Sequence, residues 1–279
     1  MSNCNTCPSS EGCGKDKEQC MIENNPHNNI KNVIGVMSGK GGVGKSSISV
    51  MLAKQLNQFG FKVGILDADI TGPSVPRLLG LTNTNAMGTE EYIYPVETED
   101  GLKVMSLNFL IEDENQPVIW RGPVVGGTVK QFWTDVLWGE LDYLIIDMPP
   151  GTGDVALTVM QLIPMDGIVM ISVPQDLVSM IVSKAVNMAK KMDINVLGII
   201  ENMSYIVCPD CGKKIQLFNG ENTDKFIKEN ELNLLGELPM VSAISNLSSS
   251  NYKDVSHELW DLFNPTVMKI LKRLAEVSQ

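Results

Sequence analysis

Apolar residues along the chain gather in short runs that are separated by segments of helical length. Six runs are dominated by Val, Ile, Leu and Met, and they lie at residues 33–37, 62–67, 102–107, 143–147, 167–173 and 196–201. Such runs are typical of strands buried on both faces, and the segments between them have the length of right-handed helical crossovers. The pattern therefore predicts an α/β fold with a doubly wound, mostly parallel sheet.

A glycine-rich loop follows the first predicted strand. It reads GKGGVGKS, and residues 47–59 after it carry apolar side chains at the spacing of one helix face. Strand, loop and helix in this order are what a GxxxxGK[ST] phosphate-binding loop requires, with Lys45 reaching the β and γ phosphates and Ser46 placed for Mg²⁺. The predicted nucleotide-binding residues are Gly39, Lys40, Gly41, Gly42, Val43, Gly44, Lys45, Ser46 and Ser47.

The loop carries a second lysine, Lys40, near its start. The cradle formed by the glycines and Lys45 is complete without it. Lys40 is therefore a candidate for contacting a phosphate held by a facing subunit.

Acidic residues end two of the predicted strands. Asp147 ends the run at 143–147, where a carboxylate can hold Mg²⁺ directly or through water, although an Asp there can also cap a helix. The segment 148–154 (MPPGTGD) mixes prolines with glycines, a composition that suits a switch loop sensing the γ-phosphate. The alternative interpretation of this segment is a plain turn.

Asp67 and Asp69 end the second predicted strand. We expect Asp67 to approach Mg²⁺ and Asp69 to orient the water that attacks the γ-phosphate. Solvated or capping carboxylates are the alternative.

Charge and hydropathy exclude several classes of protein. The chain of 279 residues has 22 Lys and Arg against 33 Asp and Glu, a net charge of −11, which argues against binding to nucleic acid. Apolar runs long enough to span a bilayer are absent, as is the apolar core of a signal peptide. The expectation is a cytoplasmic protein without a membrane partner.

Residues 1–30 differ in composition from the rest of the chain. They are rich in Asn, Ser, Gly, Lys and Cys, so they are expected to form a flexible tail ahead of a compact domain at residues 31–279. In a reducing cytosol, clustered cysteines indicate metal or redox chemistry. The tail group could hold a 4Fe-4S cluster, hold zinc or remain as free thiols; its members are Cys4, Cys7, Cys13 and Cys20.

The remaining two cysteines, Cys208 and Cys211, form a CxxC pair. Two thiolates are too few for a tetrahedral site in one chain, but two chains related by a two-fold axis supply the four that a 4Fe-4S cluster requires. Half of a zinc knuckle, a redox pair and inert cysteines are the other interpretations. The CxxC spacing alone supports a zinc site and an iron–sulfur cluster about equally.

The loop with its second lysine resembles the deviant Walker-A ATPases, which include the ParA/MinD proteins and the nitrogenase iron protein. Within that group the match over residues 31–279 is closer to the Mrp/ApbC-type iron–sulfur cluster carriers. The motifs that carry it, besides the loop, are DADITGPSVP at 67–76, WRGP at 120–123, DMPPGTGD at 147–154, ENMS at 201–204 and CPDC at 208–211.

The resemblance implies a homodimer that sandwiches two ATP molecules and hydrolyses them, with Asp69, Lys40 and Lys45 as the catalytic residues. It also implies that Lys40 reaches the ATP of the opposite subunit and that Asn202 contacts adenine. Cys208 and Cys211 would bridge the dimer through a 4Fe-4S cluster that is passed to apo iron–sulfur proteins. In relatives with a second cluster the fourth ligand lies upstream, so here Cys20 would have to replace it.

Two rival functions remain. One is a ParA/MinD-like positioning ATPase on DNA or membrane, against which the net charge and the cysteine pairs weigh. The other is an ATP-dependent iron–sulfur reductase, which requires a stable redox-active bridge and a dedicated electron acceptor.

Overall fold

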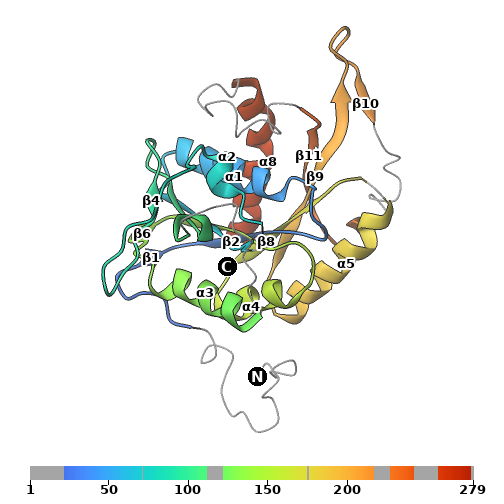
Figure 1. Ribbon diagram of the computed structural model, residues 1–279. Coiled ribbons are helices and arrows are strands. Elements are labelled where there is room, and N and C mark those ends of the chain that lie inside the picture. The colour runs from blue at the N-terminus through green and yellow to red at the C-terminus, as the bar shows by residue number, and fades with distance from the viewer. Residues whose placement is uncertain are drawn as a thin grey trace.

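A central sheet divides the molecule into two helical layers (Figure 1). The computed structural model describes residues 22–70, 72–111, 122–174, 176–216, 227–241 and 257–277. Within them the sheet has nine strands, in the spatial order β10 (Lys214–Gln216), β9 (Val196–Val207), β8 (Gly167–Ser172), β2 (Val33–Ser38), β7 (Tyr143–Asp147), β3 (Val63–Asp67), β5 (Lys103–Ser106) and β4 (Val96–Glu97), with β11 (Leu234–Pro239) also paired to β9.

The sheet is parallel except at two places. β10 pairs antiparallel with β9, and β4 pairs antiparallel with β5, while the other pairs are parallel. β2 lies between β7 and β8, so the chain crosses to either side of it and the strand order reverses there. Ligands of such sheets bind outside the carboxyl ends of the strands at this reversal. The predicted doubly wound sheet is confirmed.

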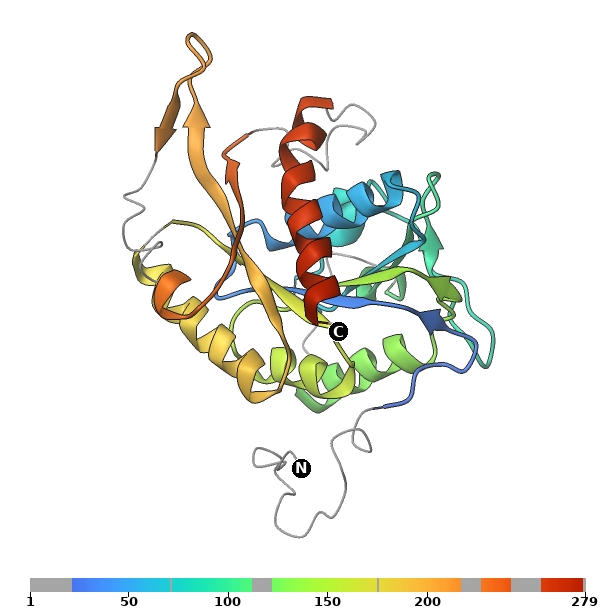
Figure 2. The same cartoon turned by 180° about the vertical axis from the view of Figure 1, so that it is seen from behind.

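Helices cover both faces (Figures 1 and 2). One layer holds α1 (Lys45–Gln58), α2 (Val75–Leu78) and α8 (His257–Val277), and the other holds α3 (Gly122–Thr134), α4 (Asp154–Leu162) and α5 (Asp176–Lys191). Every residue of β2, β3 and β8 is buried, which is the consequence of apolar runs packed against helices on both sides.

Smaller elements complete the described part of the chain. A short helix, η2 (Leu107–Phe109), follows β5, and β1 (Asn29–Ile30) pairs with β6 (Glu140–Leu141) outside the main sheet.

The packed part of the chain begins earlier than the sequence predicts. The indole N–H of Trp133 donates to the carbonyl of Ile22 at 2.9 Å, and the Asn28 side chain donates to Val136 O and accepts from Gly139 N. Residues 22–30 are thus attached to the domain, although their polar composition predicts a tail. The four tail cysteines lie outside the described residues.

Candidate functional site

The glycine loop lies between the carboxyl end of β2 and the first turn of α1. Gly42 and Gly44 have φ of +80° and +83°, a conformation that favours glycine, and Gly44 is the N-cap of α1 without a side-chain cap. A Cβ atom at Gly41 or Gly42 would meet nothing within 4 Å, so the loop borders open space. A helix N-terminus with uncapped N–H groups facing such space is suited to bind an anion.

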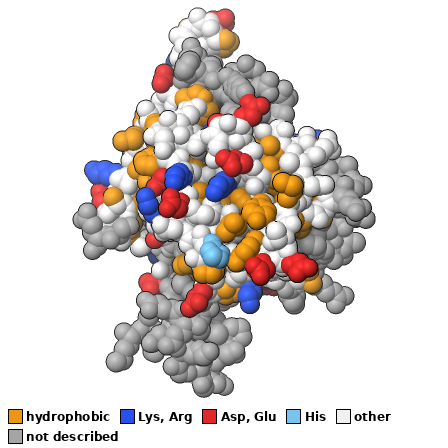
Figure 3. Space-filling model, turned by 90° about the vertical axis from the view of Figure 1, so that its left-hand side faces the viewer, with side chains coloured by type: hydrophobic (Ala, Val, Ile, Leu, Met, Phe, Trp, Pro, Cys, Tyr) orange, Lys and Arg blue, Asp and Glu red, His pale blue; other side chains and the backbone are white. Residues whose placement is uncertain are grey.

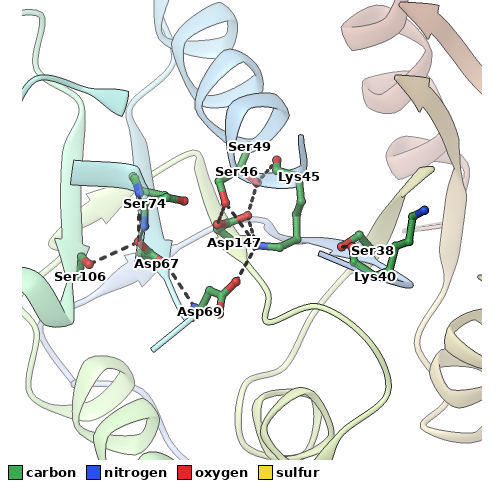
Figure 4. Close-up of polar contacts among 11 residues, drawn as sticks. Ser38, Lys40, Lys45, Ser46, Ser49, Asp67, Asp69, Ser74, Ser106 and Asp147 are labelled. Atoms are coloured by element: carbon green, nitrogen blue, oxygen red, sulfur yellow. Dashed lines mark hydrogen bonds and ion pairs between the residues drawn. The ribbon is translucent and has the colours of Figure 1, made fainter. Parts of the chain in front are cut away.

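Behind the loop, Asp147 is fully buried and bound by three side chains of α1 (Figure 4). Lys45 Nζ lies 2.8 Å from Asp147 Oδ1, and Ser46 Oγ donates to Oδ2 at 2.6 Å. Ser49 Oγ donates to Oδ1 at 2.7 Å. The loop lysine and the two hydroxyls therefore converge on one carboxylate at the end of β7.

Ser49 is the member of this group that sequence reasoning missed. It follows Lys45 by four positions, so it lies one helical turn further along the same face of α1. Its hydroxyl also lies 3.1 Å from the Lys45 carbonyl oxygen, but the charged carboxylate is the stronger acceptor. The helical spacing from the loop lysine is the signal that could have found it.

Asp69 also approaches the loop lysine, with its Oδ2 3.6 Å from Lys45 Nζ. Lys45 thus lies between two carboxylates, and its side chain is only 6% exposed. This is a geometry from which the ammonium group can turn toward a phosphate.

Asp67 is fully buried and holds the loop that follows it. Its carboxylate accepts the backbone N–H groups of Asp69, Ser74 and Val75 at 3.0 to 3.2 Å, and Ser106 Oγ donates to it at 3.4 Å (Figure 4). Burial, together with the charge of Asp147, raises the pKa of Asp67 to about 8. In this structure Asp67 holds the backbone of Asp69, Ser74 and Val75, and its role toward Mg²⁺ stays a prediction.

Lys40 is half-buried, and its side chain points away from Lys45 and Asp147 (Figure 4). Its carbonyl oxygen accepts a hydrogen bond from Ser38 Oγ at 2.9 Å, which fixes the start of the loop. The orientation is compatible with a contact outside the loop of its own subunit, and the role across subunits stays a prediction.

Asn202 lies in β9 and contacts the glycine loop directly. Its Nδ2 donates to Val43 O at 2.9 Å, and a Cβ atom on Gly44 would be only 2.3 Å from the same nitrogen. Its Oδ1 is buried and has no hydrogen-bond partner among the described residues. A buried acceptor beside a phosphate loop is suited to receive a donor from a ligand.

The segment 148–154 begins directly after Asp147. Met148 N donates to Val36 O, and Gly151 N donates to Ser38 O, so the segment is tied to β2 at two points before α4 begins at Asp154. It therefore runs next to the start of the glycine loop, where a switch loop is expected. Its response to a γ-phosphate stays a prediction.

Cys208 and Cys211 lie in the turn of the β9–β10 hairpin, which projects from the body of the molecule (Figures 1 and 2). Cys208 N donates to Lys213 O at 3.0 Å and Gly212 N donates to Cys208 O at 2.9 Å, so the turn is closed by its own backbone. Both thiols are reduced, Cys211 is exposed, and hydrogen bonds from the N–H groups of Asp210 and Cys211 lower the pKa of Cys208.

Within the described residues, groups of three or more His, Cys, Asp and Glu side chains that could hold a metal ion do not occur. In the same residues, helices long and apolar enough to cross a membrane are also absent.

Comparison with known proteins assigns the family. The family described as "ParA: NUBPL iron-transfer P-loop NTPase" matches residues 29–275. The chain belongs to this family. The predicted resemblance to iron–sulfur cluster carriers with a P-loop ATPase fold is confirmed.

Relatives within the family are similar over most of their length. The iron-sulfur cluster carrier protein of Clostridium perfringens is 48% identical over 260 residues, covering 89% of this chain and 90% of that protein. The protein of the same name from Methanocaldococcus jannaschii is 47% identical, covering 85% of this chain and 83% of that protein.

Solved structures agree with this assignment. A nucleotide-binding protein from Archaeoglobus fulgidus, in complex with ADP, is 41% identical with a TM-score of 0.72, covering 84% of this chain and 92% of that chain. MinD in a MinC:MinD complex from Aquifex aeolicus has a TM-score of 0.60 at 17% identity, covering 86% of this chain and 96% of that chain. At that identity the likeness shows a shared fold alone.

Proposed function

We propose that this protein binds and hydrolyses ATP and carries a 4Fe-4S cluster that it transfers to apoproteins. The observation that carries the proposal is the combination of two sites in one chain. One is a phosphate loop backed by the buried Lys45–Asp147 pair, and the other is a pair of thiols, half-buried Cys208 and exposed Cys211, on a projecting turn. The relatives named cluster carriers support the same function.

The oxygen atoms at the base of the loop fit Mg²⁺, a hard cation that prefers hydroxyl, carboxylate and water ligands. Ser46 and Asp147 are the residues that would hold it, with Asp67 as a further candidate. Bound there, Mg²⁺ would neutralise charge on the β and γ phosphates.

The other groups of the site have separate tasks. Lys45 would turn from its two carboxylates toward the phosphates, and Asp69 would then orient the attacking water. The buried Oδ1 of Asn202 would accept the amino group of adenine.

The cluster is cargo that two subunits would hold together. Two copies of the Cys208–Cys211 turn supply four thiolates, and an exposed turn can approach a second copy without displacing the core. Lys40 would reach the ATP of the facing subunit. The same approach of two subunits would then complete the nucleotide sites and bring the two turns together.

The cluster proposal is tested by anaerobic reconstitution of the full chain, followed by iron, sulfide and zinc analysis. We expect Cys208→Ala combined with Cys211→Ala to abolish the cluster shared between subunits and its transfer to an apo-acceptor. Lys213→Ala, in the same turn but with both thiols kept, should load and transfer as the wild type does. Unchanged loading and transfer by the double variant would overturn the proposal, and stoichiometric zinc without iron would favour a zinc site.

The two rival functions have their own readouts. Strong ATP-dependent co-sedimentation with DNA or liposomes by iron-free protein would favour a positioning ATPase. Electron transfer from reduced, cluster-loaded protein without transfer of iron and sulfide would favour a reductase.

A further inference from the structure

β9 connects the two proposed sites within one strand. Its residue Asn202 contacts the glycine loop, and Cys208 follows the end of the strand six positions later. At about 3.3 Å per residue this is a separation of about 20 Å along the strand. The route between the two sites is therefore short and continuous.

The strand is irregular at the point where it meets the loop. Glu201 faces Glu237 of β11, but the next pair joins Tyr205 to Pro239, so β9 advances four residues while β11 advances two. Pairing with β8 ends at Glu201, opposite Ser172. Residues 202–204 thus form a bulge, a feature that re-aims side chains and bends the strand that carries it.

The centre of the bulge, Met203, has an unusual backbone conformation. Its φ is +55°, in the left-handed region that residues with long side chains rarely adopt. Its Cε would lie 3.7 Å from a Cβ atom on Gly44, so the half-buried side chain reaches the loop beside Asn202. A residue keeps such a conformation only where its surroundings enforce it, and the surroundings of Met203 include the glycine loop.

Beyond the bulge, the strand has a different set of partners, because β10 replaces β8 beside it. Tyr205 O accepts from Met240 N at 2.8 Å, and Lys214 Nζ lies 4.3 Å from the centroid of the Tyr205 ring. Val207 pairs with Lys214 in the hairpin that carries the thiols. The part of β9 before the bulge pairs with β8 and β11, whereas the part after it pairs with β10 of the hairpin and, at Tyr205, still with β11.

We infer that the bulge at residues 202–204 couples the glycine loop to the cysteine turn, with Met203 as the residue that positions the turn. Nucleotide binding reshapes the loop, the Asn202–Val43 hydrogen bond and the Met203 contact transmit the change, and the hairpin turns about the bulge. The inference rests on the proposed function, since it requires ATP at the loop.

Thiol reactivity tests the coupling without any cluster present. Cluster-free, full-length protein is alkylated with iodoacetamide with and without saturating Mg-ATP, and each cysteine peptide is quantified by mass spectrometry. We expect ATP to change the rates at Cys208 and Cys211 by about fivefold in the wild type. Met203→Gly, which frees the backbone, should reduce the change to less than about twofold and keep the ATP affinity.

Glu231→Gly is the matched control, because Glu231 also has a positive φ, +54°, but is exposed and lies outside β9. It should respond as the wild type does. Hydrogen exchange of wild-type peptides covering residues 205–216 gives a measurement that depends on no variant, and we expect ATP to change it.

The possible failures are distinguishable. A wild-type response in Met203→Gly, or ATP binding that leaves both the thiol rates and the exchange unchanged, would overturn the coupling and leave the proposed ATP site standing. Failure of the wild type to bind ATP would overturn the proposed function and the coupling with it.

Discussion

The phosphate loop and the cysteine turn differ in where the partners of their polar side chains come from. Asp147 is fully buried and receives Lys45, Ser46 and Ser49 from its own chain. The cysteine turn projects from the sheet, leaves Cys211 exposed and offers only two thiols. In the first region the side chains behind the loop are paired with one another within one chain, whereas in the second the two thiols form no group of three or more possible metal ligands among the described residues.

On the face shown in Figure 3, Lys and Arg side chains are interspersed with Asp and Glu instead of gathering into one continuous basic area. Under the proposed function, the difference between the two sites means that the groups backing the phosphate loop come from one subunit, while the cargo would be held only when two subunits meet.

The largest effect is expected at Lys45, where a substitution tests whether the groups that bind the phosphates come from one subunit. Lys45→Ala removes the cation between Asp147 and Asp69 and the expected phosphate contact, so we expect ATP affinity to fall by about 100-fold, or about 2.7 kcal/mol. Isothermal titration calorimetry measures this. Lys62→Ala, which loses only an exposed ion pair with Glu140, is the control and should bind as the wild type does. Equal affinity of the Lys45 variant would contradict a phosphate-binding role.

The second prediction separates binding from chemistry within the same region. Asp69→Asn keeps the size of the side chain but cannot orient a water as a carboxylate does, so turnover should fall by about 100-fold while ATP still binds. Single-turnover phosphate release beside ATP titration measures both quantities. Asp261→Asn, on the exposed face of α8, serves as the control. Normal hydrolysis by the Asp69 variant would mean that another group orients the attacking water.

Local sequence signals predicted the loop, the sheet and the acidic strand ends, because glycine spacing and apolar runs act through neighbouring residues. Two features of β9 carried no such signal. A methionine at positive φ has no sequence signature, and the Asn202–Val43 contact joins residues 159 positions apart. The strand was predicted to end at Glu201, where the bulge begins, although it continues to Val207.

The beginning of the packed domain escaped prediction for a related reason. The asparagines of residues 22–30 made the segment resemble a tail. In the folded chain, however, Asn28 pairs with backbone groups of Val136 and Gly139, which are more than 100 positions away in the sequence. Polar composition alone does not distinguish a solvated segment from one that is hydrogen-bonded to a distant turn.

The third prediction concerns Lys40, the loop residue that we expect to act on the ATP of the facing subunit. The Lys40 side chain points away from Lys45, so Lys40→Ala should leave ATP binding by each subunit intact while hydrolysis falls by about tenfold. Sedimentation with ATP should also show less dimer. Lys130→Ala, an exposed lysine on α3, is the control. If hydrolysis and dimerisation are unchanged, the two regions are not linked through Lys40.

The smallest expected effect concerns Ser49, which lies behind the site. When ATP engages Lys45 and Mg²⁺ engages Ser46, Ser49 is the remaining one of the three side chains that hold Asp147. Ser49→Ala should therefore raise the Mg²⁺ concentration needed for tight ATP binding by about threefold, and should lower the free energy of unfolding by about 1 to 2 kcal/mol. Thr128→Val is the matched control, because it removes a buried helical hydroxyl that donates to the backbone carbonyl of Val124 and not to a carboxylate. A loss of stability without any change in the Mg²⁺ requirement would mean that Ser49 supports the fold but does not position Asp147.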